Sequence, residues 1–222
     1  MKKILTAKKL FKSYGDLQVL KNINIEIEDN EIVAIVGPSG AGKTTLLHIL
    51  GTLDPPDNKK ESSLVVDQNN ITHLSDKDLA EFRNKNMGFI FQFHELLPEF
   101  TALENVCLPT WIGKNSTNNT KNSAMELLKR LGVDNRASHK PSALSGGEQQ
   151  RVAVARALVN NPKIIFADEP SGNLDSKNAN QLHDLFFELR KERGFSFVIV
   201  THNKDLAKRA DRTISLKDGY VV

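Results

Sequence analysis

The chain has 222 residues, a length that fits one large domain or a core domain with a small inserted subdomain. With 39% hydrophobic and 26% charged residues, and no apolar run near the ~18 residues that span a bilayer, its composition is that of a water-soluble globular protein. The net charge of +3 is mild and the basic residues are scattered, which argues against nucleic acid as a partner. Cys107 is the only cysteine, so an internal disulfide is excluded, as is usual in the cytoplasm.

Strand patterns and helical patterns alternate in the first third of the chain. Apolar residues alternate over Val19–Ile27, and Ile32–Val36 is a continuous apolar run, so both are predicted strands. A glycine-rich loop follows the second strand and leads into a predicted helix over Thr44–Leu50. Ser75 and the Asp78 carboxylate have the spacing of a capping box and predict a further helix start. The alternation favours an α/β core.

The middle of the chain, roughly residues 93–141, is predicted to be mostly helical. Thr101–Glu104 and Ser123–Glu126 each have the spacing of a capping box, and Gly132 is expected to stop the second helix. A stretch rich in Asn, Thr and Ser over Gly113–Ser123 predicts a surface loop between these two helices.

The last third of the chain returns to the α/β alternation. Lys163–Asp168 and Phe195–Thr201 are predicted strands, and Ser176–Arg193 between them is a predicted helix that ends at Gly194. Asp218 and the glycine after it predict a hairpin turn near the C-terminus.

The glycine-rich loop Gly37–Thr44 fits the phosphate-loop pattern G-x-x-x-x-G-K-[ST] between a strand and a helix. Its glycines let backbone N–H groups face phosphates, Lys43 adds a positive charge, and the Thr44 hydroxyl can bind Mg²⁺. A purely structural turn is the alternative, and the lysine and the strand–loop–helix context disfavour it.

The apolar strand that ends at Asp168 and Glu169 brings two adjacent carboxylates to a strand end. Ligands of open α/β sheets bind at the carboxyl ends of the strands, so both acids are expected near the phosphates. Asp168 suits a Mg²⁺ shell, and Glu169 suits a general base or a group that orients water. The alternative, a solvated pair of acids, is disfavoured because the phosphate loop is present.

The stretch Ser145–Glu148 is a capping box with two glycines between the serine and the glutamate. Helix N-termini attract anions, and the glycines leave room for a phosphate to approach the backbone. The local pattern is equally typical of an ordinary capped helix, so the residues alone leave both interpretations open.

In combination, these motifs resemble the ATP-binding cassette (ABC) ATPases, and the resemblance covers essentially the whole chain. The residues that carry the resemblance are Gly37–Thr44, Gln92, Leu144–Arg151, Ile164–Glu169, Asp175 and His202. The resemblance implies an α/β fold with a P-loop NTPase core, an antiparallel β subdomain and an inserted α-helical subdomain. Residues 1–222 would form one such domain, with the helical subdomain at roughly 93–141, and ATP and Mg²⁺ as cofactors.

The resemblance also assigns roles to single residues. ATP would be bound by Tyr14, stacked on adenine, and by Gly37, Pro38, Ser39, Gly40, Ala41, Gly42, Lys43, Thr44 and Thr45. Catalysis would rest on Lys43, Gln92, Glu169 and His202, and Mg²⁺ would be held by Thr44, Gln92 and Asp168. Two copies of the chain would lie head to tail, with Asp175 at their interface. The ATP held by one copy would be contacted by four residues of the other copy: Ser145, Gly146, Gly147 and Gln149. A tyrosine in the core or on the surface is the alternative for Tyr14.

A narrower resemblance comes from Phe91–Val106, which is similar to the ATPase subunits of lipoprotein-releasing systems. It implies integral membrane subunits as partners, contacted through Gln92–Phe100, and a peripheral position on the cytoplasmic face of the inner membrane. MacB-type export ATPases and FtsE-like regulatory ATPases remain as alternatives, and a soluble ABC ATPase that acts on DNA or ribosomes is the third. One departure from the family is Asn30 in place of a glycine, which is benign because asparagine tolerates left-handed turns.

Overall fold

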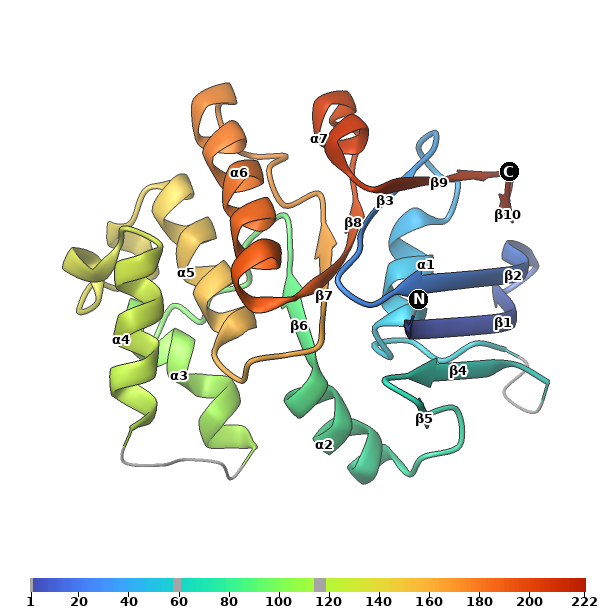
Figure 1. The fold of residues 1–222 in the computed structure, drawn as a ribbon, viewed down its shortest axis with the longest axis horizontal. Helices are drawn as coiled ribbons and strands as arrows, with labels where there is room; N and C mark the ends of the chain where they lie inside the picture. Colours follow the sequence, from blue (N-terminus) through green and yellow to red (C-terminus); the bar gives the residue numbers. More distant parts are fainter. Residues whose placement is uncertain (1, 58–60, 114–118) are drawn as a thin grey trace.

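The computed structural model describes residues 2–57, 61–113 and 119–222, which form two β-sheets and a set of helices (Figure 1). The first sheet has four antiparallel strands in the order β2-β1-β4-β5. Its strands are β1 (Lys3–Tyr14), β2 (Leu17–Glu28), β4 (Ser63–Val66) and β5 (Asn69–Asn70). The second sheet has six strands in the order β10-β9-β3-β8-β7-β6 and is parallel except at β10. Its strands are β3 (Ile32–Val36), β6 (Met87–Ile90), β7 (Ile164–Asp168), β8 (Ser196–Val200), β9 (Arg212–Lys217) and β10 (Tyr220–Val221).

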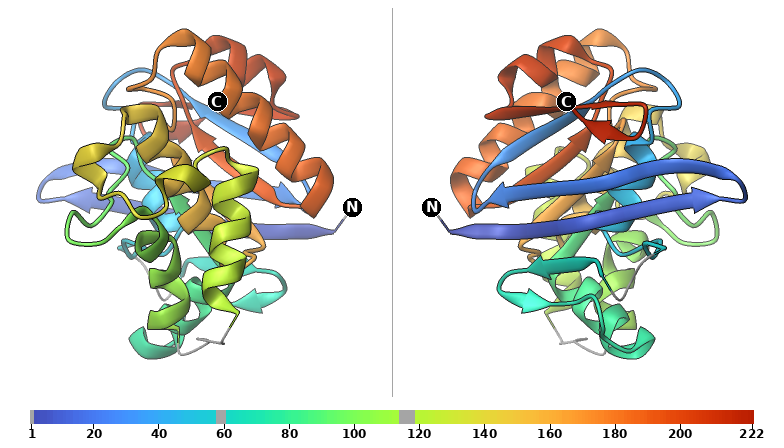
Figure 2. Two further views of the ribbon diagram at one scale, coloured as in Figure 1. Left: turned by 90° about the vertical axis from the view of Figure 1, so that its left-hand side faces the viewer. Right: turned by 90° about the vertical axis from the view of Figure 1, so that its right-hand side faces the viewer.

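Seven α-helices and two 3₁₀ turns lie in the described residues. The α-helices are α1 (Lys43–Leu50), α2 (Asp76–Asn86), α3 (Ala102–Ile112), α4 (Thr120–Arg130), α5 (Gly146–Leu158), α6 (Ser176–Arg193) and α7 (Lys204–Arg209). The 3₁₀ turns are Asp134–Arg136 and Pro141–Ala143. Helix α3 packs against α4 and α5, and these three helices lie at the end of the molecule opposite β1 and β2 (Figures 1 and 2). None of the described helices has the length and apolar character that crossing a bilayer requires.

The parallel sheet separates two hydrophobic cores because successive strand residues point to opposite faces. On β7, Ile164 and Phe166 belong to the core shared with α1 and the antiparallel sheet. Ile165 and Ala167 belong to the core shared with helices α3 to α6. Burial on both faces explains why this strand is a continuous apolar run in the sequence. Both cores therefore hold the end of β7, and with it Asp168, in a fixed position.

Most of the predicted elements are confirmed. The apolar alternation in β2 buries Ile23, Ile25 and Ile27, while the residues between them are exposed. Asn30 has φ 60°, which is the left-handed turn that asparagine tolerates in place of glycine. Gly194 follows α6 with φ 69°, so the predicted helix stop is also correct.

The capping predictions have mixed outcomes. Ser75 caps α2 by accepting a hydrogen bond from the Asp78 N–H, and Thr101 forms a complete capping box with Glu104. The prediction for Ser123 is wrong, because α4 begins at Thr120 and Ser123 lies inside it. Thr120, Ala124 and Leu128 are the buried residues of α4, so this inward-facing stripe begins before the serine. Residues 114–118 of the predicted surface loop lie outside the described residues.

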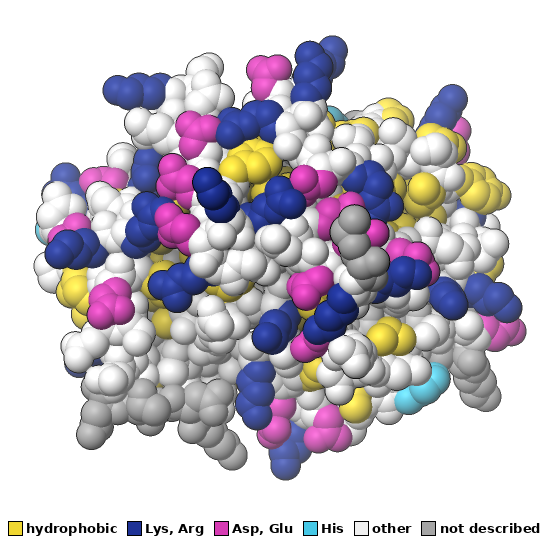
Figure 3. Space-filling model, in the orientation of Figure 1, with side chains coloured by type: hydrophobic (Ala, Val, Ile, Leu, Met, Phe, Trp, Pro, Cys, Tyr) yellow, Lys and Arg dark blue, Asp and Glu magenta, His cyan; other side chains and the backbone are white. Residues whose placement is uncertain are grey.

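The surface carries both charge signs side by side. On the face shown in Figure 3, Lys and Arg side chains are interspersed with Asp and Glu side chains. Ion pairs between surface side chains in the described part of the chain include Arg130 with Glu188 and Glu192, and Arg209 with Asp184. Neither sign of charge is concentrated on this face.

Candidate functional site

A cavity of about 590 Å³ lies where the parallel strands end and α1 begins. It brings together most of the residues that the sequence singled out: Ser39, Gly40, Gly42, Lys43, Thr44, Thr45, Gln92, Asp168, Glu169 and His202. Val19, Gly172 and Val200 complete its lining. The residues come from the loop after β3, the end of β6, the end of β7 and the end of β8. The site therefore lies at the carboxyl edge of the sheet, as the strand-end argument predicts.

The phosphate loop is shaped by close packing against its own chain. A Cβ at Gly37 would lie 2.1 Å from the Leu216 carbonyl oxygen, so no other residue fits there. Gly42 has φ 95° and precedes α1 without giving it a side-chain cap. The buried Lys43 ammonium donates to the carbonyls of Gly37 (3.0 Å) and Pro38 (2.9 Å). The first N–H groups of α1 thus face the cavity without a side-chain partner, which suits an anion.

The two acids at the end of β7 have different environments. The Oδ1 atom of Asp168 is buried and has no hydrogen-bond partner among the described residues. Glu169 has φ 42°, and its Oε2 accepts a hydrogen bond from the backbone N–H of His202 at 3.1 Å. The His202 Nε2 lies 3.4 Å from Oε1 of the same carboxylate. Burial raises the pKa of Glu169, and the hydrogen bond from the His202 backbone opposes that rise.

Gln92 links the cavity to the loop that follows Glu169. A Cβ at Gly172 would lie 2.9 Å from the Gln92 Nε2, so the glycine leaves room for this side chain. The Gln92 carbonyl accepts a hydrogen bond from Asn173 Nδ2 at 3.0 Å. Sequence reasoning missed Gly172 and Asn173 as partners of Gln92, because the contact joins residues about 80 positions apart. The only local signal is a glycine between polar residues.

The residues predicted to hold Mg²⁺ fit that ion. The Thr44 hydroxyl, the Gln92 amide and the Asp168 carboxylate line the same cavity, and all three offer oxygen atoms. The partnerless, buried Oδ1 of Asp168 is the kind of atom that a cation satisfies. The described residues form no cluster of three or more His, Cys, Asp or Glu that could hold a metal. A small oxygen set suits Mg²⁺, which usually keeps few protein ligands and completes its shell with water and phosphate.

Tyr14 lies at the end of β1 and does not line the cavity. Its hydroxyl donates to Asp54 Oδ2 at 2.6 Å, and this hydrogen bond raises the pKa of Tyr14. The ammonium of Lys12 bonds the other oxygen of Asp54 at 2.7 Å and lies 5.1 Å from the centre of the tyrosine ring. The ring is half exposed, so it remains accessible to a planar ligand. Sequence reasoning missed Lys12 and Asp54 as the groups that hold this ring.

The second phosphate-type helix start, at α5, lies apart from the cavity. Ser145 and Glu148 form the predicted capping box, in which Glu148 Oε2 accepts from the Ser145 N–H at 2.7 Å. Arg136 donates to the other carboxylate oxygen at 2.8 Å. The Ser145 backbone N–H, followed by Arg136, lowers the pKa of Glu148 to about 2. Within one chain, therefore, the structure does not bring Ser145–Gly147 to the phosphate loop.

The two glycines of this helix start are not required by the fold of the chain. A Cβ at Gly146 would meet no atom within 4 Å, and one at Gly147 would lie 3.4 Å from Asn178 Oδ1, an acceptable contact. Neither glycine has a positive φ. Their N–H groups have no partner among the described residues, as expected for the first turn of a helix. The exposed N-terminus of α5 therefore has both free space beside its glycines and backbone N–H groups without a partner.

Asp175 has a local role that sequence reasoning missed. Its Oδ1 accepts from the Asn178 N–H at 2.9 Å, and Oδ2 accepts from the Asn178 side chain at 2.6 Å, so Asp175 caps α6. Asn178 is also the residue that a Cβ at Gly147 would contact, at 3.4 Å. The loop that begins at Glu169 thus ends beside the start of α5. The signal for the cap was present in the sequence, because an aspartate directly before a helical pattern is a common N-cap.

Comparison with known proteins agrees with this geometry. A family model described as "ABC transporter" matches residues 20–172. A lipoprotein-releasing system ATP-binding protein LolD from Cytophaga hutchinsonii is 55% identical over 222 residues, which is 100% of both chains. The LolD protein of Bacteroides fragilis is 58% identical over 211 residues, covering 95% of this chain and 96% of the relative.

Solved structures with the same fold are also found. The ATP-binding cassette MJ0796, in a dimeric post-hydrolysis state bound to ADP and Pi, is 42% identical with a TM-score of 0.89, covering 98% of this chain and 96% of that chain. A second dimeric structure of MJ0796 matches with the same values. The cbiO1 protein of Clostridium perfringens, part of an ABC transporter complex, is 28% identical with a TM-score of 0.87, covering 100% of this chain and 88% of that chain.

Proposed function

The chain belongs to the ABC transporter family, and on that basis we propose that it is the ATP-hydrolysing subunit of a transporter that releases lipoproteins from the inner membrane. The observation that carries the hydrolysis is the Glu169 carboxylate, held by the His202 backbone in the same cavity as the phosphate loop. The lipoprotein cargo is supported by the identity of 55–58% to LolD proteins along nearly the whole chain.

In the proposed reaction, the phosphate loop and the N-terminus of α1 bind the phosphates of ATP, and Tyr14 stacks on the base. Glu169 accepts a hydrogen bond from the attacking water and orients it toward the γ-phosphate. Lys43 and His202 donate to the phosphoryl oxygens as their negative charge develops. Bound Mg²⁺, held by Thr44, Gln92 and Asp168, would neutralise phosphate charge. The raised pKa of Glu169 makes it a stronger base than an ordinary carboxylate.

A second copy of the chain would complete each site. Because Ser145–Gly147 lies apart from the cavity of its own chain, the free N–H groups of Gly146 and Gly147 suit a nucleotide held by another copy. The MJ0796 relative is described as dimeric, which supports a dimer here. Two copies arranged head to tail would enclose two ATP molecules.

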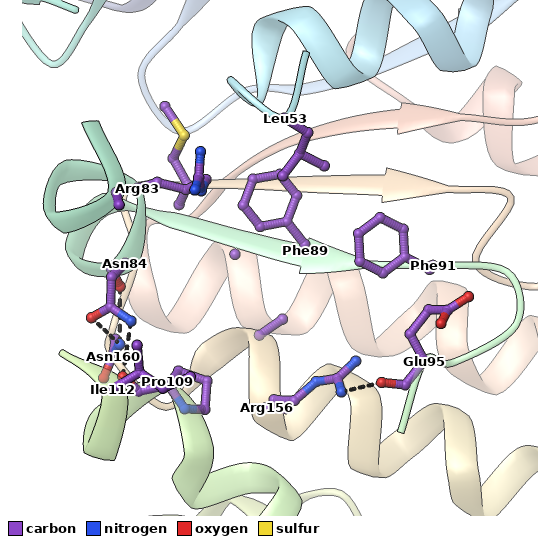
Figure 4. A pocket seen from close by; sticks show the side chains of 14 residues that line it. Leu53, Arg83, Asn84, Phe89, Phe91, Glu95, Pro109, Ile112, Arg156 and Asn160 are labelled. Atoms are coloured by element: carbon purple, nitrogen blue, oxygen red, sulfur yellow. Dashed lines mark hydrogen bonds between the residues drawn. The ribbon is translucent and has the colours of Figure 1, made fainter. Parts of the chain in front are cut away.

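A groove of about 420 Å³ is the proposed contact for the membrane subunits (Figure 4). It lies between α2, α3, α5 and β6, and its wall includes Phe89, Phe91, Glu95, Pro109 and Arg156 (Figure 4). Ile112 on its wall is 73% exposed, and Phe93 in the adjoining segment is 72% exposed. Exposed apolar side chains that gather along one groove, rather than singly, mark a binding surface. Through this groove the chain would be held at the cytoplasmic face of the inner membrane.

The hydrolysis is tested with Glu169→Gln, which removes the carboxylate charge and keeps the shape. We expect ATP binding within about twofold of the parent, turnover lower by roughly 10³-fold, and an ATP-bound dimer in gel filtration. Glu126→Gln, a change at an exposed carboxylate on α4, is the matched control and should behave like the parent. If Glu169→Gln keeps its turnover, Glu169 has no part in hydrolysis. If Glu169→Gln stays monomeric with ATP, the head-to-tail dimer is contradicted.

The cargo is tested with the complex of this chain and its co-purified membrane subunits, reconstituted in vesicles that contain lipoproteins. We expect ATP-dependent release of lipoproteins from the vesicles, and no release with Glu169→Gln. Co-purification of cell-wall hydrolase regulators in place of a lipoprotein-binding membrane subunit would overturn the proposed cargo. An active complex that leaves lipoproteins in the membrane would overturn it as well.

A further inference from the structure

The segment after Gln92 contains a strained turn. His94 has φ 63° and Glu95 has φ 50°, so two successive residues with side chains adopt the left-handed conformation. Only two backbone hydrogen bonds lie within the turn, from the His94 N–H to the Phe91 carbonyl (3.2 Å) and from the Glu95 N–H to the Phe93 carbonyl (2.7 Å). Strained backbone of this kind persists where surrounding groups hold it in place.

Arg156 on α5 is the group that holds this turn. Its guanidinium donates to the carbonyls of His94 (2.7 Å) and Glu95 (2.5 Å), and the second bond is visible in Figure 4. The planar fork of arginine can serve two adjacent acceptors at once, which the point charge of lysine cannot. No carboxylate among the described residues forms an ion pair with Arg156. The arginine is thus dedicated to the backbone of the turn.

The far end of the same segment is held by a second buried side chain. Asn105 on α3 accepts from the Leu97 N–H at 2.8 Å and donates to the carbonyls of Leu97, Phe100 and Thr101 at 3.0–3.1 Å. Asn105 is fully buried. The segment from 93 to 101 is therefore tied to helices α3 and α5, while Gln92 at its start lines the nucleotide cavity.

Helix α5 connects Arg156, which holds the turn, to the N-terminus of the same helix at Ser145–Gly147. Arg156 lies eleven residues after Ser145 on the same helix, a span of about 16 Å. Val152, Val154 and Ala155 between them are completely buried, so the helix is packed along its length. Arg156 also lines the groove of Figure 4, as does Glu95. One helix therefore contacts the groove at one end and presents the free donors of Gly146 and Gly147 at the other.

We propose that Arg156 is a positioning residue that couples the His94–Glu95 turn to α5, so that nucleotide binding at the start of α5 and the shape of the groove change together. This inference rests on the proposed function, because the nucleotide at the start of α5 is held by a second copy. Coupling of this kind is reciprocal, so an occupant of the groove that fixes the turn also favours the nucleotide-bound arrangement of α5.

The test compares hydrogen exchange in Glu169→Gln with and without ATP, alone and combined with Arg156→Ala. In Glu169→Gln we expect ATP to slow exchange both at amides 145–149 and at amides 93–97. With Arg156→Ala added, the protection at 145–149 should remain and the protection at 93–97 should fall at least fivefold. Arg130→Ala, which removes an arginine with two hydrogen bonds on α4, is the matched control and should keep both effects.

Arg156→Lys keeps the charge but reaches one carbonyl, so it should restore part of the protection at 93–97. In the complex with its membrane subunits, Arg156→Ala should lower kcat about tenfold and leave the KM for ATP within twofold. Unchanged ATP protection at 93–97 in the Arg156→Ala combination would overturn the coupling, as would parental kcat in the complex. Failure of the proposed function has a different signature, since Glu169→Gln alone would then show no ATP protection at 145–149.

Discussion

Helices α1 and α5 both begin with a glycine-rich turn suited to phosphate, yet the two N-termini are built differently. The start of α1 has no side-chain cap, lies in a cavity and has the buried Lys43 beside it. The start of α5 has a complete capping box, lies on the surface and has the Glu148 carboxylate beside it. A capped and exposed N-terminus is stable without a ligand, whereas an uncapped one in a cavity gains most from an anion.

The two N-termini also differ in whether the fold requires their glycines. Gly37 is required because a Cβ would collide with the Leu216 carbonyl, and Gly42 because of its positive φ. Gly146 has neither constraint, since a Cβ there would meet empty space. The first helix start is thus shaped by its own fold, and the second leaves space that its own fold does not use. This difference supports a nucleotide from a second copy at α5.

The largest expected effect is at α1. Lys43→Ala should lower kcat/KM for ATP by about 10² to 10³, because a preorganised positive donor to the phosphates is lost. Steady-state ATPase assays measure this change. Lys121→Ala on α4 removes an exposed lysine and serves as the control. Parental activity in Lys43→Ala would show that the α1 site does not bind the reacting phosphates.

A smaller loss is expected at α5. Ser145→Arg should lower turnover about 100-fold by filling the space in front of Gly146, while ATP binding by the monomer stays within about twofold. Equilibrium binding of labelled ATP and single-turnover hydrolysis separate the two effects. If turnover is retained, the start of α5 has no part in catalysis.

A pair of glycine substitutions tests the structural half of the comparison. Gly37→Ala should destabilise the fold by more than about 2 kcal/mol, because the Cβ would lie 2.1 Å from a backbone oxygen. Gly146→Ala should leave the free energy of unfolding unchanged or raise it by about 0.5 kcal/mol. Urea unfolding followed by circular dichroism measures both values. Similar losses in the two variants would show that Gly146 is also a structural glycine.

The smallest effect is expected for the cap of α5. Glu148→Gln should lower the free energy of unfolding by about 1 kcal/mol at pH 7, because the charged cap and its bond to Arg136 are weakened. The pKa of Glu148 is about 2 in the folded chain against 4.5 for the unperturbed group. The contribution is therefore complete above about pH 4.5 and is lost as the pH falls toward 2.

Urea unfolding of the parent and of Glu148→Gln checks this prediction at pH 7, 5.5 and 4. The difference between the two proteins should be constant from pH 7 to 5.5 and smaller at pH 4. A difference that grows on acidification would mean that Glu148 is not held as a carboxylate by its neighbours.

The features predicted from sequence are those that local patterns determine. The phosphate loop was predictable because its glycine spacing follows an apolar strand, and the adjacent acids because strand ends meet at one sheet edge. The capping boxes at Thr101 and Ser145 were predictable because each cap lies within four residues. The helical subdomain boundary at roughly 93–141 and the catalytic roles of the site residues stay predictions.

The features that were missed depend on contacts between distant residues. Arg156 donates to backbone carbonyls 61 and 62 positions away in the sequence, and no rule of sequence spacing predicts such a bond. Lys12 meets Asp54 across 42 positions. At Ser123 the local cap signal was present but the buried stripe that begins at Thr120 set the helix start. Tertiary packing therefore decided each of these cases.

The empty space in front of Gly146 has a genetic consequence. In a head-to-tail pair, a defect at Lys43 disables the site of its own chain, whereas a defect at Gly146 disables the site of the partner. A pair of one Lys43→Ala chain and one Gly146→Arg chain concentrates both defects in a single site and leaves the other intact. Two alleles that are each inactive alone should thus complement one another when co-expressed. A chain with both changes should instead inactivate both sites of any pair that it forms.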